Sequence, residues 1–140
     1  MWCNGMSENF KEAMRWLRQA EKDLSTAKNS FVSGDYEWAC FQSQQSAEKA
    51  LKSVLYSKGF RKILTHSIFE LVKETSDLEG GFKKFKKEAK VLDSVYIPAR
   101  YPNGIAGDLA PFEYYEKEDA EECIKYAELI LEEVKKLIKK

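Results

Sequence analysis

The chain has 140 residues, with 23 basic and 23 acidic side chains and a formal net charge of zero. This length suits a single domain with one core, and a hydrophobic content of 44% is too high for a disordered chain. The balanced charge excludes a general nucleic-acid-coating protein, and no apolar stretch approaches the roughly 20 residues that cross a bilayer.

The first two long segments predict a hairpin of two antiparallel helices. Residues 7–33 carry apolar side chains at steps of three and four, and Ser7 is a natural N-cap. Residues 35–58 carry a second apolar stripe that begins at Asp35, another natural N-cap. The joint at residues 33–35 is so short that the two helices are expected to lie side by side.

Three further segments predict helices in the second half of the chain. The first of them begins at Thr65 or at Ser67, where Ser67 and Glu70 have capping-box spacing, and ends at about Asp77. Residues 81–96 place apolar side chains at helical spacing among lysines, which we expect to be solvated, with binding of RNA phosphate as the alternative. Residues 117–140 carry the most regular apolar stripe, with acids early and lysines late, as the helix dipole favours. The lysines of the fourth segment are Lys83, Lys84, Lys86, Lys87 and Lys90.

These segments define the fold class and the domain organisation. No stretch shows sustained period-two alternation, so the sequence predicts an all-α, up-and-down bundle of about five helices. We expect a flexible N-terminus over residues 1–6 and a single domain over residues 7–140. The start lacks the pattern of a secretory signal, and the three cysteines lack the close Cys or His partners that bind zinc. We therefore expect a cytoplasmic protein without metal or cofactor, in which Cys40 and Cys123 are packed thiols.

The segment from residue 97 to residue 116 is longer than most connections between helices and is rich in aromatic side chains. Tyr96, Tyr101 and Tyr114 offer ring faces that could stack on a base, and the Arg100 guanidinium is a fork that fits phosphate. These residues are candidates for a nucleotide site. The alternative is that the rings pack the segment onto the bundle while Arg100 pairs with an acid.

Three polar residues outside that segment are further candidates. His66 is the single histidine, so one chain contains no histidine pair for a metal or a proton relay. Arg61 precedes it at a spacing that could direct a cation and a general acid or base at one phosphate. The alternative is that His66 merely hydrogen-bonds at a helix start. Gln44 falls among apolar positions of the second helix, so its amide requires partners, either within the fold or at a ligand site.

Four short strings, taken in order, resemble the HEPN domain. They are residues 16–24, which contain WL and AEKDL, residues 39–52 (ACFQSQQSAEKALK), residues 65–68 (THSI) and residues 96–102 (YIPARYP). The resemblance covers the chain from about Phe10 to the last helix. It implies a helical bundle similar to the helical domain of kanamycin nucleotidyltransferase. It also implies a homodimer of the small prokaryotic type that is often encoded beside a minimal nucleotidyltransferase.

The resemblance implies two activities that predict different residues. Nucleotide binding would use Arg100, whereas ribonuclease members carry an arginine followed, after four to six residues, by a histidine. Residues 105–107 contain no histidine, so this motif does not follow Arg100, although Arg61 and His66 have the right interval. We expect a non-enzymatic dimeric module that binds a nucleotide or a nucleotidyltransferase partner in a toxin–antitoxin-like pair. The alternatives are a metal-independent ribonuclease toxin using Arg61 and His66, and a purely structural helical adaptor.

Overall fold

The computed structural model describes residues 4–138, which form six α-helices and two short 3-10 helices. In chain order these are α1 (Asn4–Val32), α2 (Tyr36–Ser57), α3 (Ile68–Leu78), η1 (Gly80–Phe85), α4 (Lys86–Ser94), η2 (Pro102–Gly104), α5 (Pro111–Tyr114) and α6 (Lys117–Ile138). No residue of this range belongs to a strand, which confirms the all-α prediction. Within the same range, no helix is both long and apolar enough to cross a membrane.

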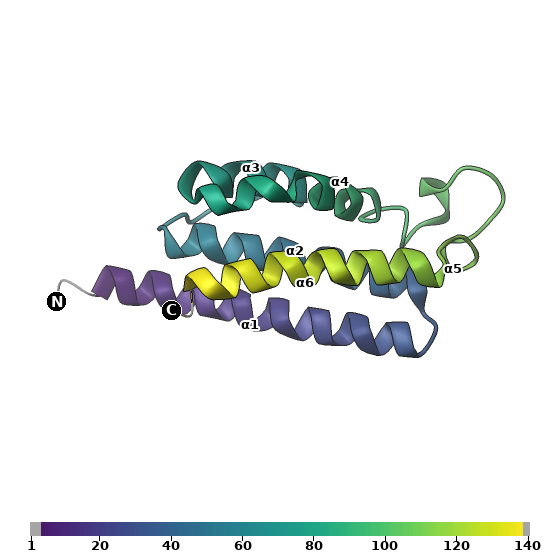
Figure 1. The fold of residues 1–140 in the computed structure, drawn as a ribbon, viewed down its shortest axis with the longest axis horizontal. Coiled ribbons are helices and arrows are strands. Elements are labelled where there is room, and N and C mark those ends of the chain that lie inside the picture. The colour runs from purple at the N-terminus through teal and green to yellow at the C-terminus, as the bar shows by residue number, and fades with distance from the viewer. Residues whose placement is uncertain (1–3, 139–140) are drawn as a thin grey trace.

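Helix α2 lies at the centre of the bundle. It packs most extensively against α1 and α6, and on its other side against α3 and α4 (Figure 1). The outer pair α3 and α4 forms a layer of its own above α2 and α6 in this view. The elements that contribute to the site described below therefore all border α2.

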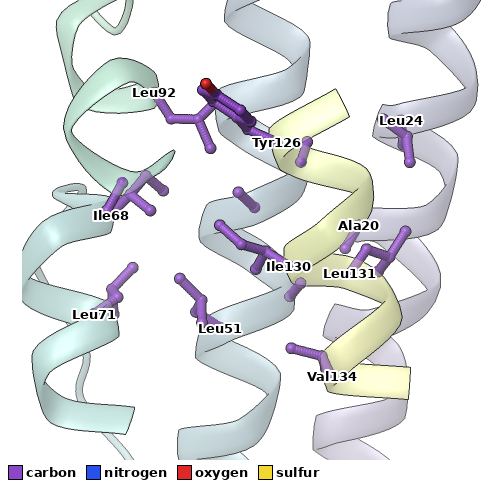
Figure 2. Close-up of a cluster of buried hydrophobic side chains, with 14 of the residues drawn as sticks. Ala20, Leu24, Leu51, Ile68, Leu71, Leu92, Tyr126, Ile130, Leu131 and Val134 are labelled. Carbon is purple, nitrogen blue, oxygen red and sulfur yellow. The ribbon is translucent and has the colours of Figure 1, made fainter. Parts of the chain in front are cut away.

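The core consists of the apolar stripes predicted from the sequence. Leu51 of α2, Ile68 of α3, Leu92 of α4 and Ile130 of α6 are fully buried and point into the same interior (Figure 2). Each such side chain contributes about 1.5–3 kcal/mol when it is removed from water. Because these apolar stripes fill the core, the polar side chains of the same helices are not needed for core packing.

The helix hairpin forms as predicted, although its capping differs. Gly34 joins α1 to α2 with φ +81°, a conformation that favours glycine. Asp35 occupies the N-cap position of α2, but its side chain makes no capping hydrogen bond. The prediction of Ser7 as the N-cap of α1 is wrong, because the helix begins three residues earlier, at Asn4, and continues through Gly5. Of the predicted flexible N-terminus, residues 1–3 lie outside the described residues and residues 4–6 form the beginning of α1.

The fourth predicted helix is divided. Its first turns form the 3-10 helix η1, and the α-helix α4 ends two residues before Tyr96. Gly80 and Gly81 weaken the α-helix here, and a 3-10 helix places Phe82 and Phe85 on one side, where both are buried. The long connection that follows α4 contains the short helices η2 and α5.

Candidate functional site

A carboxylate clamp brings two distant parts of the chain together beside α2. Asp93, near the end of α4, accepts hydrogen bonds from the backbone N–H of Ile68 (2.6 Å) and of Phe69 (3.1 Å). Its second oxygen also accepts from the hydroxyl of Ser67 (3.0 Å), which is the N-cap of α3 as predicted. The residues that precede α3 therefore lie next to the chain that leaves α4.

Arg100 lies on a platform of three aromatic rings. Its guanidinium carbon is 4.3 Å from the ring centre of Phe41, 4.6 Å from that of Tyr96 and 5.3 Å from that of Tyr101. The Nε–H donates to the backbone carbonyl of Tyr96 at 2.8 Å. Among the described residues, no carboxylate forms an ion pair with Arg100. The alternative expected from the sequence, in which Arg100 pairs with an acid, is therefore not observed. The platform fixes the guanidinium and leaves its terminal N–H groups available for an anion.

His66 lies on the same aromatic group. Its ring stacks on Tyr96 with 5.3 Å between ring centres and 19° between planes, and 56% of its side chain is exposed. Its Nδ1 is 3.0 Å from Oε2 of Glu48. Because an ionised carboxylate only accepts hydrogen bonds, Nδ1 carries the proton of this contact. In the neutral ring, Nε2 is then the atom that can accept a proton or a hydrogen bond from a ligand.

The Glu48 carboxylate is the centre of a buried polar network on α2. Glu48 and Lys52 are each 4% exposed, and Lys52 Nζ is 2.9 Å from the oxygen that also contacts His66. The fully buried Gln44 donates to the other Glu48 oxygen (3.3 Å) and to the backbone carbonyl of His66 (3.0 Å). Lys52 balances the charge of Glu48, and Gln44 holds both the carboxylate and the backbone of His66 in place.

The network continues from α2 towards α1. Lys52 Nζ lies 5.8 Å from the ring centre of Trp16, which stacks on Tyr56. Trp16 borders an open groove of about 500 Å³ between α1 and α2, which Arg15, Arg18 and Lys49 also line. Two of these cations already have acidic partners on α1: Arg15 pairs with Glu12, and Lys49 pairs with Asp23.

Two predicted site residues lie apart from this cluster. Arg61 is exposed and donates to the backbone carbonyls of Gly59 (3.1 Å) and Phe60 (3.3 Å). No hydrogen bond or ion pair joins it to His66 within the described part of the chain. The structure therefore shows no direct contact for the Arg61 and His66 pair suggested by the sequence interval.

Tyr114 is the other separate residue. It packs edge-on against Tyr115, with 5.1 Å between ring centres, and borders a pocket of about 330 Å³ beside α6. The structure thus brings together five of the predicted site residues and leaves Arg61 and Tyr114 outside. The five are Gln44, His66, Tyr96, Arg100 and Tyr101.

Four members of the site were absent from the predicted set. Phe41, Glu48 and Lys52 lie on one face of α2 with Gln44, at intervals of three and four residues. The spacing shows that these side chains share a face with Gln44, but it does not by itself show that the face is buried. Asp93 had no comparable signal, since its partners are about 25 positions earlier in the chain.

The cysteines take no part in the cluster. Cys40 and Cys123 are buried, as predicted, and Cys3 lies outside the described residues. The hydrogen bond between the two thiols, together with burial, raises the pKa of Cys40. A buried, protonated thiol is a poor nucleophile and a poor metal ligand. Among the described residues, no group of three His, Cys, Asp or Glu side chains is arranged to hold a metal ion.

The fold and the cluster define a small all-helical domain that presents a held arginine and a histidine on aromatic rings. Residues 13–137 match the model of the HEPN domain, and the chain belongs to this family. The resemblance and the fold class inferred from the sequence are thereby confirmed.

Three similar proteins illustrate the family relationship. The Methanocaldococcus jannaschii protein named "Putative toxin MJ1304" is 36% identical over 138 residues, covering 94% of this chain and 91% of that protein. The crystal structure of TT1696 from Thermus thermophilus has a TM-score of 0.79 and 38% identity, over 89% of this chain and 96% of that one. The structure of ST0689, an archaeal HEPN homologue, has a TM-score of 0.74 and 42% identity, over 90% and 97% of the two chains.

Proposed function

We propose that this HEPN protein binds a nucleotide through its phosphate groups at the Arg100 platform. The observation that carries this proposal is the Arg100 guanidinium, which three aromatic rings hold in place and no described carboxylate neutralises. A fixed guanidinium loses little conformational freedom when it binds, so more of its charge-assisted hydrogen bonding contributes to affinity.

The neighbours of Arg100 fit the other parts of a nucleotide. The ring of Tyr101 is half exposed and can stack on a base. His66 is exposed beside Tyr96 and offers Nε2 to a phosphate or a sugar hydroxyl, while Glu48 fixes its orientation through Nδ1. A base, a sugar and a phosphate could therefore each meet a matching group within this one cluster.

The direct test measures binding of fluorescently labelled ATP and GTP to wild-type protein and to matched arginine variants. Arg100→Ala should weaken affinity about tenfold to a hundredfold, as expected for the loss of a charge-assisted hydrogen-bond donor. Arg61→Ala is the control, because it removes the same charge from an exposed arginine outside the cluster. Equal affinity of wild type and Arg100→Ala, with an unchanged circular dichroism spectrum, would reject the proposal.

The second part of the proposal concerns assembly. We propose that the protein acts as a homodimer with a small nucleotidyltransferase partner, in a toxin–antitoxin-like pair. The toxin name of the Methanocaldococcus jannaschii relative supports the toxin-like role, and the family resemblance supports the dimer and the partner. Light scattering after size exclusion, on this protein alone and mixed with a small nucleotidyltransferase, measures both associations. A monomer that does not co-elute with such a protein would contradict this part alone.

RNA cleavage is a second candidate, favoured by the held histidine. With Nδ1 bound to Glu48 and a side chain that is 56% exposed, His66 could act on a ligand through Nε2 as a general acid or base. Incubation with mixed RNA in EDTA tests this, using wild type, His66→Ala, Arg61→Ala and Arg100→Ala. Cleavage that disappears with His66 supports the ribonuclease, and the arginine variant that shares the loss identifies its cationic partner. Intact RNA with the wild type excludes this activity for the substrates used.

The structural adaptor is the remaining alternative. It predicts that nucleotide affinity and RNA cleavage are both absent from the wild-type protein, while the helical fold is intact. The nucleotide titration and the RNA assay together therefore separate all three functions.

A further inference from the structure

A basic groove lies between α3 and the start of α4, outside the Arg100 cluster. Its volume is about 460 Å³, and its apolar lining, here called its floor, consists of the half-buried Phe69 and the buried Val72. Three lysines, Lys73, Lys83 and Lys86, also line it, together with Ser76 and Asp77. We call this space the basic groove.

The lysines of the groove have no acidic partners within the fold. Lys73, Lys83 and Lys86 form no ion pair with any described carboxylate, and Asp77 is the one acidic residue among those that line the groove. A neighbouring lysine behaves differently, since Lys84 Nζ is 3.1 Å from Glu133 of α6. In a chain with a net charge of zero, the groove is thus a local excess of positive charge.

We infer that the basic groove binds an acidic peptide segment of a partner protein, with an apolar side chain of that segment on the groove floor. Carboxylates of the segment would complement the three unpaired ammonium groups, and burial of one apolar side chain would cover Phe69 and Val72. The groove follows Phe69, Lys73 and Asp77 along two turns of α3, about 12 Å. This length accommodates roughly four residues of an extended peptide.

The same features disfavour RNA as the occupant. Single-stranded RNA is bound by aromatic faces that stack on bases and by arginine. The lining of the groove contains a single aromatic ring, that of Phe69, and no arginine. An apolar floor framed by lysines fits an acidic amphipathic peptide better than it fits a chain of phosphates and bases.

The test selects peptides from a displayed random library, about 12 residues long, against the wild-type protein. The expected result is enrichment of sequences that combine several Asp or Glu residues with a Leu, Ile or Phe. The best enriched peptide is then synthesised and titrated against the triple variant Lys73→Glu, Lys83→Glu, Lys86→Glu. We expect its affinity to fall by at least about tenfold, since like charges then face each other.

A matched variant controls for net charge. Lys22, Lys117 and Lys125 are exposed lysines of α1 and α6, outside the groove, and their replacement by Glu changes the total charge equally. This control should keep affinity within about twofold of wild type, and circular dichroism should be the same for all three proteins. Replacement of the apolar residue of the peptide by Ser should also reduce affinity.

Three outcomes would overturn the inference. They are selection that enriches no acidic peptide, equal peptide affinity of the groove variant and the wild type, and equal loss in the control variant. A uridine oligonucleotide that binds the wild type but not the groove variant, without any selected peptide, would assign the groove to nucleic acid instead. The inference does not depend on nucleotide binding at Arg100, and Arg100→Ala should leave peptide affinity unchanged.

Discussion

Helix α2 buries two unlike stripes of side chains. One stabilises the fold, and the other orients a residue of the candidate site. One stripe is apolar and includes Ala47, Leu51 and Val54, whereas the other includes the buried Glu48 and Lys52. Apolar burial stabilises the fold directly. A buried ion pair stabilises it little compared with apolar residues of similar size, although removal of one partner costs a great deal. The polar stripe is therefore better explained by the orientation of His66 than by stability.

The largest effect is expected from breaking the polar stripe at its centre. Glu48→Gln leaves the ammonium group of Lys52 buried without a counter-charge and should lower the free energy of unfolding by about 3–5 kcal/mol. Urea denaturation measures this change. The double variant Glu48→Met, Lys52→Met removes both charges and should recover most of the stability. Its nucleotide affinity should be lower than that of wild type, because His66 loses the carboxylate that orients it. A double variant as unstable as Glu48→Gln would show that the ion pair itself stabilises the fold.

Truncation in the apolar stripe should affect stability alone. Leu51→Ala leaves a cavity in the core and should lower the free energy of unfolding by about 2–5 kcal/mol. Nucleotide affinity, measured at a temperature at which circular dichroism shows a folded protein, should match that of wild type. If affinity falls under those conditions, the two stripes are not independent.

Alkaline pH should weaken the apolar side of α2 through Cys40. Its pKa is raised in the folded state by the hydrogen bond with Cys123 and by burial, so the unfolded chain releases this proton first. The contribution of this thiol to the free energy of unfolding is fully present below the pKa of an unfolded cysteine, about 8.5. Above that pH it is lost by up to about 1.4 kcal/mol per pH unit. Urea denaturation between about pH 7 and pH 10 should give a steeper decline for wild type than for Cys40→Ala. Parallel declines would exclude this thiol as the cause.

The smallest effect on stability is expected at the clamp. Asp93→Ala removes the acceptor at the N-terminus of α3 and should cost about 1 kcal/mol, as is typical of a lost helix cap. Its effect on nucleotide affinity should exceed that of Ser67→Ala, because Asp93 also ties α3 to the end of α4. Both variants are compared by thermal denaturation and by the ATP titration. Equal affinities for the two would mean that the clamp does not position the site.

Most of the fold could be predicted because helix formation here follows local rules. The apolar spacing of three and four located the long helices, and Ser67 correctly marked the start of α3. The errors are also local. Gly5 does not stop α1, which begins at Asn4 rather than at Ser7. The packing of Phe82 and Phe85 favours a 3-10 turn that helical spacing alone does not distinguish.

The site was harder to predict because its members meet only in the folded chain. Arg100, Tyr96 and Tyr101 are close in sequence, so their cluster could be anticipated from composition. Glu48 and Lys52, four residues apart on a helix, have the spacing of an ordinary surface ion pair, and only folding shows that they are buried. Their roles, like those of the other site residues, stay predictions until the variants are measured.

The clamp at Asp93 also has a consequence for motion. By joining Ile68 to Asp93 across 25 positions, it closes α3, η1 and α4 into one loop of chain. Segments tied in this way tend to open and exchange their amide hydrogens as a unit. His66 lies just before one end of this loop and Arg100 just after the other. A ligand held by both would therefore slow amide exchange throughout the outer helical pair, including turns that the ligand never touches.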